Sequence, residues 1–254
     1  MIFETHAHYD DEAFDEDRDE LIPKLYREGI EKIVNISVNR KTCEETLGLI
    51  EKYPFFYGAL GYHPSDCAYF NEDEYQWIKD ASKHERVVAI GEIGLDYHWP
   101  EPEREFQKKV FKEQLKLAHE TGLAIVVHSR DAAKDTMDIL KEQGSGLSGV
   151  VHCYSYHVQD ALEYVKLGFN IGIGGVITFK NAHKLREVAE AVPLENIVVE
   201  TDCPYLAPEP YRGKRNCSLY LSLVIEKLAE IKGITAEEAE EATFKNALRM
   251  YNII

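Results

Sequence analysis

Residues 87–97 read VVAIGEIGLDY, a short apolar run that ends at the acidic residue Glu92. The pattern returns in residues 124–130, AIVVHSR, where a histidine follows the apolar run. Continuous apolar runs rich in β-branched residues are typical of strands that are buried on both faces of a parallel sheet. A polar residue directly after such a strand is costly to bury without a partner, so these strand ends indicate a functional site.

Similar apolar runs recur along the chain and alternate with amphipathic segments. The predicted strands are residues 2–6, 32–37, 56–61, 87–91, 124–128, 150–153, 168–173 and 196–200. The predicted helices are residues 17–28, 42–52, 74–83, 102–121, 132–143, 158–166, 183–191, 218–231 and 236–251. Gly29 and Gly122 occupy positions where helices commonly end, and Pro102 lies near a helix start.

The predicted strand ends are evenly spaced. Between His8 and Asp202 they lie about 28 residues apart, which suits a strand–helix–strand unit of roughly 30 residues. Eight such units predict an α/β fold, a (β/α)₈ TIM barrel. An open doubly wound sheet is the alternative. Because no linker or low-complexity stretch interrupts the pattern, residues 1–254 are expected to form one domain.

The composition is that of a globular protein. Hydrophobic residues make up 44% and charged residues 29% of the 254 positions, which excludes a disordered chain. The five cysteines form no C-x-x-C pair, so neither a disulfide framework nor a zinc ribbon is indicated. Without an apolar run of about 18 residues or a signal-peptide pattern, we expect a cytoplasmic protein with no membrane partner and no obligate protein partner.

The charge balance constrains the substrate. Lys and Arg number 29 against 45 Asp and Glu, a formal net charge of −16. This argues against broad electrostatic capture of nucleic acid, which depends on basic side chains that neutralise phosphates. A phosphate held locally by metal ions remains compatible with it, because a bound ion dominates the charge of its site.

Metal-capable side chains follow most of the predicted strands. His6 and His8 lie two residues apart on one strand, so both imidazoles point the same way. Glu92 suits a bridge between two cations, and Asp202 suits a residue that orients a water or accepts its proton. Each position alone also fits an ordinary buried or capping residue; their joint placement favours a metal centre. The predicted ligands are His6, His8, Glu92, His128, His152 and Asp202.

Further polar residues suit contacts with a substrate. His63 follows a strand in the segment GYHP, where it reaches either the substrate or a metal, or simply caps a loop. Arg130 shares a strand face with His128, and its guanidinium suits a phosphate group or an ion pair within the protein. Asp96 is expected to organise the loop after its strand.

These motifs together resemble the TatD-related metal-dependent deoxyribonuclease family, part of the amidohydrolase-like barrel group. The matching segments run from residue 5 to 216 in family order. They read THAH (5–8), GYHP (61–64), GEIGLDY (91–97), VVHSRDA (126–132), HCYS (152–155), ETDCPYLAP (200–208) and RN (215–216). The family usually has Asp in place of Glu4, Gly in place of Tyr156, and a Pro two residues after Asn216, where this chain has Ser218. None of these departures removes a proposed ligand.

The resemblance implies a TIM barrel with a two-metal hydrolytic centre. His6 and His8 resemble ligands of one metal, His128 and His152 resemble ligands of the second, and Glu92 resembles the bridge. Asp202 resembles the catalytic aspartate, and the expected phosphate contacts are His63, Arg130 and Arg215. The expected cofactors are two divalent ions (Zn²⁺, Mg²⁺, Mn²⁺ or similar), and the expected partner is DNA or another phosphodiester substrate.

The predicted activity is therefore hydrolysis of phosphodiester bonds, as in an exonuclease-type deoxyribonuclease that acts on ester bonds. Two alternatives stay open. A barrel hydrolase with the same ligands would act on an ester, an amide or an aminoacyl ester. A barrel that metal merely stabilises would act as a binding module, although six ligands exceed what a structural four-coordinate site needs.

Overall fold

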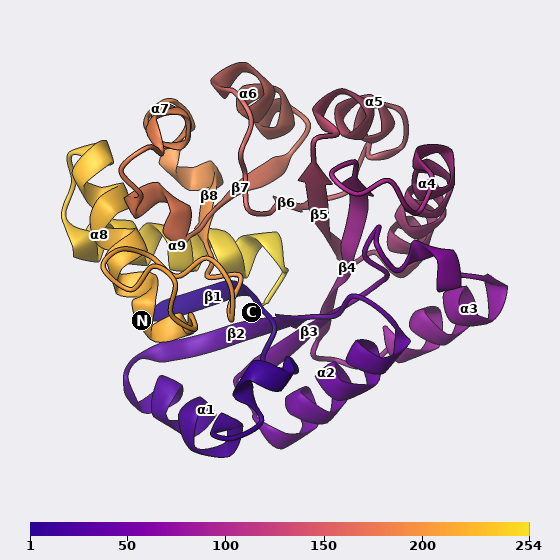
Figure 1. Cartoon of the computed structure of the whole chain (residues 1–254), viewed down its shortest axis with the longest axis horizontal. Helices are drawn as coiled ribbons and strands as arrows, with labels where there is room; N and C mark the ends of the chain where they lie inside the picture. The colour runs from indigo at the N-terminus through magenta and orange to yellow at the C-terminus, as the bar shows by residue number, and fades with distance from the viewer. Residues whose placement is uncertain (254) are drawn as a thin grey trace.

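The computed structural model describes residues 1–253, in which eight parallel strands form one sheet in sequential order (Figure 1). The strands are β1 (Ile2–Ala7), β2 (Ile30–Ile36), β3 (Phe56–Leu60), β4 (Val87–Asp96), β5 (Ala124–Arg130), β6 (Gly149–Val151), β7 (Phe169–Ile173) and β8 (Ile197–Val199). The last strand returns to the first, where Ala7 and Cys203 form a parallel bridge. The predicted TIM barrel is confirmed.

The helices form a ring around the strands (Figure 1). They are α1 (Arg18–Arg27), α2 (Arg40–Lys52), α3 (Glu72–Ala81), α4 (Arg104–Thr121), α5 (Ala133–Gln143), α6 (Val158–Lys166), α7 (His183–Ala191), α8 (Leu221–Lys232) and α9 (Ala236–Met250). Gly122 ends α4 in the left-handed conformation (φ +70°) that its position in the sequence predicts. Within residues 1–253, no helix combines the length and the apolar character needed to cross a membrane.

Two apolar layers hold the barrel together. The larger layer fills the space between the strands and the helices. The smaller one fills the barrel interior, where Phe3, Val126 and Val198 pack with Met250 and Tyr251 from the end of α9. The Tyr251 hydroxyl donates to the backbone oxygen of Thr5 at 2.9 Å. The last helix therefore closes the amino end of the barrel, and the opposite end stays open for a site.

β4 is longer than the apolar run predicts. The predicted strand ends at residue 91, but pairing with β5 resumes at Ile93 and continues to Asp96 after a register shift. Gly91 and Gly94 permit this close pairing, since a Cβ on Gly91 would lie 2.6 Å from the Val126 Cβ. Gly94 has φ +143°, and a Cβ there would lie 2.0 Å from the His128 backbone oxygen. The irregularity lets the strand carry both Glu92 and Asp96 at the open end.

Candidate metal centre

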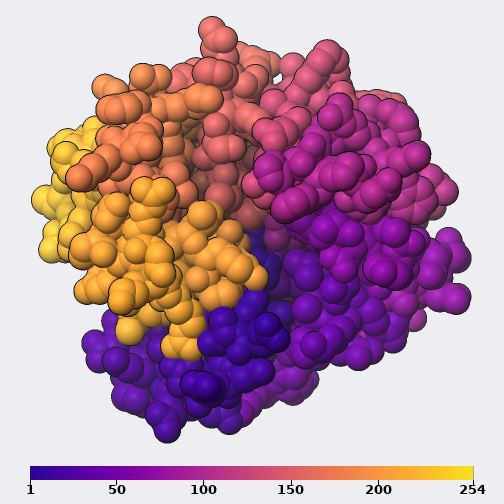
Figure 2. Space-filling view, in the orientation of Figure 1, coloured from indigo at the N-terminus to yellow at the C-terminus, as the bar shows by residue number. Residues whose placement is uncertain are grey.

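The predicted ligands converge at the carboxyl end of the barrel. All of them except the fully buried His6 line a cavity of about 780 Å³, which is the hollow near the middle of the face shown in Figure 2. Loops after β1 and β8 border this hollow. Active sites of (β/α)₈ barrels lie at this end, because each strand delivers its last side chains to the same rim. The structure thus brings together side chains that are nearly two hundred residues apart in sequence.

A first group of donor atoms surrounds one oxygen of Glu92. His6 Nε2 lies 3.3 Å and His8 Nε2 lies 3.9 Å from Glu92 Oε2. Asp202 Oδ1 lies 3.6 Å from His6 Nε2 and 3.4 Å from His8 Nε2. Two imidazole nitrogens and two carboxylate oxygens within 4 Å of their neighbours form a donor set that fits a divalent cation.

A second group surrounds the other oxygen of Glu92. Oε1 lies 2.7 Å from His128 Nδ1 and 2.7 Å from His152 Nε2. These two ring nitrogens are 3.2 Å apart. His152 also stacks on His6, with ring centroids 4.0 Å apart, so the second group adjoins the first. Glu92 consequently presents one oxygen to each group, as a bridging carboxylate does.

The electrostatics of the cluster favour ionised carboxylates. Burial opposes the ionisation of Glu92, but His152, His128 and His6 outweigh it and hold the Glu92 pKa well below its usual value. Asp202 likewise has a lowered pKa despite burial, because His8 and other histidines face it. In turn, Asp202 and Glu92 raise the pKa of His8 to about 9 against the effect of burial. The carboxylates are therefore charged at neutral pH, in the state that binds metal.

Hydrogen bonds behind the donor groups orient them. His8 Nδ1 lies 2.9 Å from the Ile36 backbone oxygen, and His128 Nε2 lies 3.2 Å from Asp96 Oδ2. Glu4 Oε2 accepts from Thr201 Oγ1 at 2.6 Å and from Ser218 Oγ at 2.9 Å. Glu4 thus ties β1 to the loop after β8 below the site.

His63 lies beside the second group rather than out in the cavity. Its Nε2 is 3.8 Å from Glu92 Oε1, and its ring meets that of His128 edge-on at 4.3 Å. The Ser65 backbone N–H donates to His63 Nδ1 at 3.1 Å, so the proton of the neutral ring resides on Nε2. Burial lowers the pKa of His63 to about 3. The ring is therefore neutral, and its Nε2–H faces the cluster.

The two predicted arginines differ in position. Arg130 is exposed and lines the cavity, as a contact to a substrate requires. Arg215 makes two short bonds to Asp17, at 2.6 and 2.7 Å, and its guanidinium lies 4.8 Å from the Phe14 ring centroid. Among the described residues, those that line the cavity do not include Arg215. The structure gives Arg215 a contact with Asp17 that joins two loops, and its contact with a phosphate stays a prediction.

Several cavity residues lie outside the predicted set. Asp96 contacts His128. The sequence indicates this position, because Asp96 follows Glu92 by four residues and residues an even number apart lie on the same face of a strand. Trp99 and Tyr205 are 57% and 54% exposed at the rim. Four acidic residues, which include no ligand candidate, also line the cavity: Asp10, Asp11, Glu12 and Glu45. They come from loops and a helix, where no periodicity in the sequence indicates a site.

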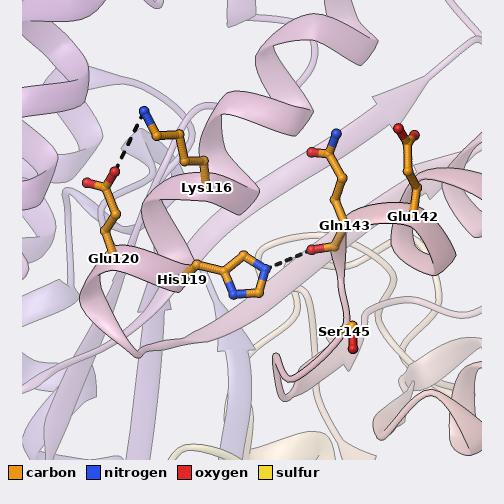
Figure 3. Close-up of a pocket in the computed structure, with 6 residues that line it drawn as sticks. All are labelled: Lys116, His119, Glu120, Glu142, Gln143 and Ser145. Carbon is orange, nitrogen blue, oxygen red and sulfur yellow. Dashed lines mark hydrogen bonds and ion pairs between the residues drawn. The ribbon is translucent and has the colours of Figure 1, made fainter.

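A second hollow, of about 460 Å³, lies between the carboxyl-terminal ends of α4 and α5 (Figure 3). Its polar groups bind one another: His119 Nε2 lies 2.7 Å from the Gln143 backbone oxygen, and Lys116 lies 3.7 Å from Glu120. Because the helices run antiparallel to the strands, this hollow lies at the end of the barrel away from the donor cluster. It has no part in the candidate site.

The chain is similar along its whole length to known metal-dependent hydrolases. The Bacillus subtilis (strain 168) metal-dependent hydrolase YabD is 44% identical over all of this chain and all of its own length. The Escherichia coli K12 hydrolase YcfH is 31% identical over 100% of this chain and 96% of its own. The crystal structure of the E. coli K12 TatD homologue YJJV superposes with a TM-score of 0.92 at 31% identity, over 100% of this chain and 98% of that one.

The family model described as TatD related DNase matches residues 3–252. That match covers nearly the whole chain, and the donor cluster lies within it. The chain therefore belongs to the TatD-related DNase family and is a metal-dependent hydrolase.

Proposed function

We propose that the chain is a phosphodiesterase that acts on DNA, with two divalent cations held by the two donor groups. The observation that carries this proposal is the placement of Glu92, whose two oxygens each face a separate set of donor atoms. Two adjacent cations suit in-line displacement at phosphorus. The name of the family supports DNA as the substrate.

Each residue has a task that follows from its position. His6, His8 and Asp202 would hold one cation, His128 and His152 would hold the other, and Glu92 would contact both. Bound cations supply Lewis acidity, which polarises the phosphoryl group and lowers the pKa of water. Asp202 is 18% exposed, so its carboxylate reaches the cavity, where it orients the attacking water and accepts its proton. The His63 Nε2–H and the Arg130 guanidinium donate to the phosphate oxygens.

The decisive experiment replaces Asp202 by Asn. At saturating Mg²⁺ or Mn²⁺ we expect kcat on single-stranded DNA to fall about a thousandfold, because the amide cannot accept a proton. Glu12→Gln is the matched control, since Glu12 lines the same cavity without touching a donor group; it should retain near-normal activity. Chelation followed by re-addition of Mg²⁺, Mn²⁺ or Zn²⁺ identifies the active metal. Near-full activity of Asp202→Asn would refute its assigned role.

A second candidate function is hydrolysis of a carboxylic ester, including an aminoacyl ester. The acidic rim favours it, because Asp10, Asp11, Glu12 and Glu45 repel a long polyanion that lies across the cavity. A side-by-side assay of DNA, a small phosphodiester and an aminoacyl ester separates the two. Turnover of the ester alone would replace the phosphodiesterase proposal.

A further inference from the structure

Two of the candidate ligands are oriented by chemically different partners. His8 Nδ1 contacts a backbone oxygen, that of Ile36, at 2.9 Å. His128 Nε2 contacts a carboxylate, Asp96 Oδ2, at 3.2 Å. Both partners fix the ring and raise its basicity, and the negatively charged carboxylate raises the basicity more than a neutral backbone oxygen does. The two donor groups therefore have unequal support.

The Asp96 carboxylate is held firmly in its place. It is 5% exposed, and its Oδ1 accepts the His98 backbone N–H at 2.9 Å, which leaves Oδ2 for His128. The buried Gln107 of α4 binds the same residue twice: Gln107 Oε1 accepts from the Asp96 N–H at 2.8 Å, and Gln107 Nε2 donates to the Asp96 backbone oxygen at 2.9 Å. Helix α4 thus fixes Asp96 through the main chain.

We propose that Asp96 is the positioning residue for the second donor group. A neutral imidazole carries one proton, and Asp96 holds that proton on His128 Nε2. The lone pair on Nδ1 is then directed at the point shared by Glu92 Oε1 and His152 Nε2, at distances of 2.7 and 3.2 Å. This inference rests on the proposed metal centre and assigns the binding strength of one of its two positions to a residue that binds no metal.

The inference predicts a selective loss of metal. Asp96→Asn removes the charge and leaves one acceptor oxygen, which serves either the His98 N–H or the His128 Nε2–H, and Asp96→Ala removes both acceptors. We expect the affinity of the second position to fall about 10- to 100-fold in the Asn variant, and further in the Ala variant. The first position, which includes His8, should keep its affinity. Glu45→Gln is the control, because it removes one carboxylate from the same cavity without contacting a donor group.

The test is a titration of the metal-free protein with Mn²⁺. Calorimetry measures the binding affinities, and electron paramagnetic resonance shows whether the bound ions are coupled. Wild type and Glu45→Gln should bind two ions and show the coupled signal of a carboxylate-bridged pair. Asp96→Asn at the same Mn²⁺ concentration should show the six-line signal of one isolated ion. Circular dichroism and the Tm of the metal-free variants verify folding; if Asp96→Ala does not fold, the Asn variant decides.

Two wild-type-like affinities in Asp96→Asn would overturn the inference, as would equal weakening of both positions. The inference would also be overturned if the wild-type chain bound a single ion and Asp96→Asn bound it with the same affinity. No step of this test uses a substrate. A protein that binds two ions and cleaves no DNA would therefore refute the proposed function and leave the role of Asp96 intact.

Discussion

At the scale of single residues, Arg130 and Arg215 show how neighbours decide the role of a guanidinium. Both are basic residues close to family-like motifs in the sequence. The structure leaves Arg130 exposed in the cavity, while Arg215 donates from Nη1 and Nη2 to Asp17 and from Nη1 to the Ala13 backbone oxygen. A guanidinium whose donors are engaged this way joins two loops, and a free one is available to an anion.

We therefore expect opposite kinetic and stability effects from the two arginine variants. Arg130→Ala should raise KM for a phosphodiester about tenfold, the effect of losing a charged hydrogen bond, with the Tm unchanged. Arg215→Ala should lower the Tm by about 2–4 °C per kcal/mol lost and leave KM unchanged. Steady-state kinetics and calorimetry of both variants check this. A raised KM in Arg215→Ala at normal Tm would return that residue to the substrate site.

The same ion pair gives an expected pH dependence. Arg215 holds the pKa of Asp17 below its usual value, so the charged form is favoured in the folded state. The contribution is complete above the pKa of the unfolded chain, near 3.8, and is lost as the pH falls through the lower folded-state pKa. Because both side chains are more than a third exposed, it amounts to at most about 1 kcal/mol.

Denaturant unfolding of wild type and Asp17→Asn at several pH values measures this contribution. The stability difference should be constant from pH 7 down to about pH 5 and should vanish towards pH 2. A difference that grows on acidification would contradict the assigned pair.

At the scale of elements, α9 differs from the helices of the outer ring because residues at its carboxyl end pack in the barrel interior. Met250 and Tyr251 fill the amino end beneath the strands, and Asn246 Nδ2 donates to the Ile197 backbone oxygen at 2.8 Å. The helix begins with a capping box, in which Thr235 accepts from the Glu238 N–H and Glu238 accepts from the Thr235 N–H. The capping box thus stabilises the start of the helix whose other end closes the barrel.

Thr235→Ala removes the hydroxyl that accepts from the Glu238 backbone N–H in this box. We expect the free energy of unfolding to fall by about 1 kcal/mol, because a helix N–H loses its acceptor. Thr235→Ser is the matched control, since it keeps the hydroxyl and should remain close to wild type. Equal destabilisation by both changes would show that the methyl group, rather than the cap, supports the helix. Denaturant titration of the metal-free chain measures the effect.

At the scale of the whole molecule, the net charge of −16 repels DNA. The four acidic residues that line the cavity add a local repulsion at the site. If the substrate is a phosphodiester, as proposed, its affinity must come from the proposed cations and from a few donors in the cavity. Such a site recognises a short, local part of a nucleic acid, because an extended track of phosphate contacts needs a basic surface.

We therefore expect a weak salt dependence. The logarithm of the affinity for single-stranded DNA, plotted against the logarithm of salt concentration, should have a slope corresponding to about two phosphate contacts or fewer. Fluorescence anisotropy with the Asp202→Asn variant in Mn²⁺ measures binding without cleavage. A steep slope would show a larger phosphate footprint than the cavity provides. The slope of Arg130→Ala should be lower by about one contact.

Much of the fold was predictable from the sequence, because buried parallel strands require continuous apolar runs that local composition reveals. β1, β5 and β7 lie where the apolar runs predict them, apart from end residues. β4 was predicted short, since its extension depends on Gly91, Gly94 and their pairing with β5. A register shift of this kind depends on contacts between strands, which the sequence of one strand does not contain.

The candidate ligands were also predictable as residue types at strand ends, where polar side chains interrupt apolar runs. By itself the sequence determined the barrel, which follows from periodicity and spacing along the chain, and it predicted six donor residues at strand ends. Only the tertiary structure decided which oxygen of Glu92 faces which histidines, that Asp96 supports His128, and that Arg215 binds Asp17. These are relations of angle and distance between distant segments, and they exist only once the strands have closed into a barrel.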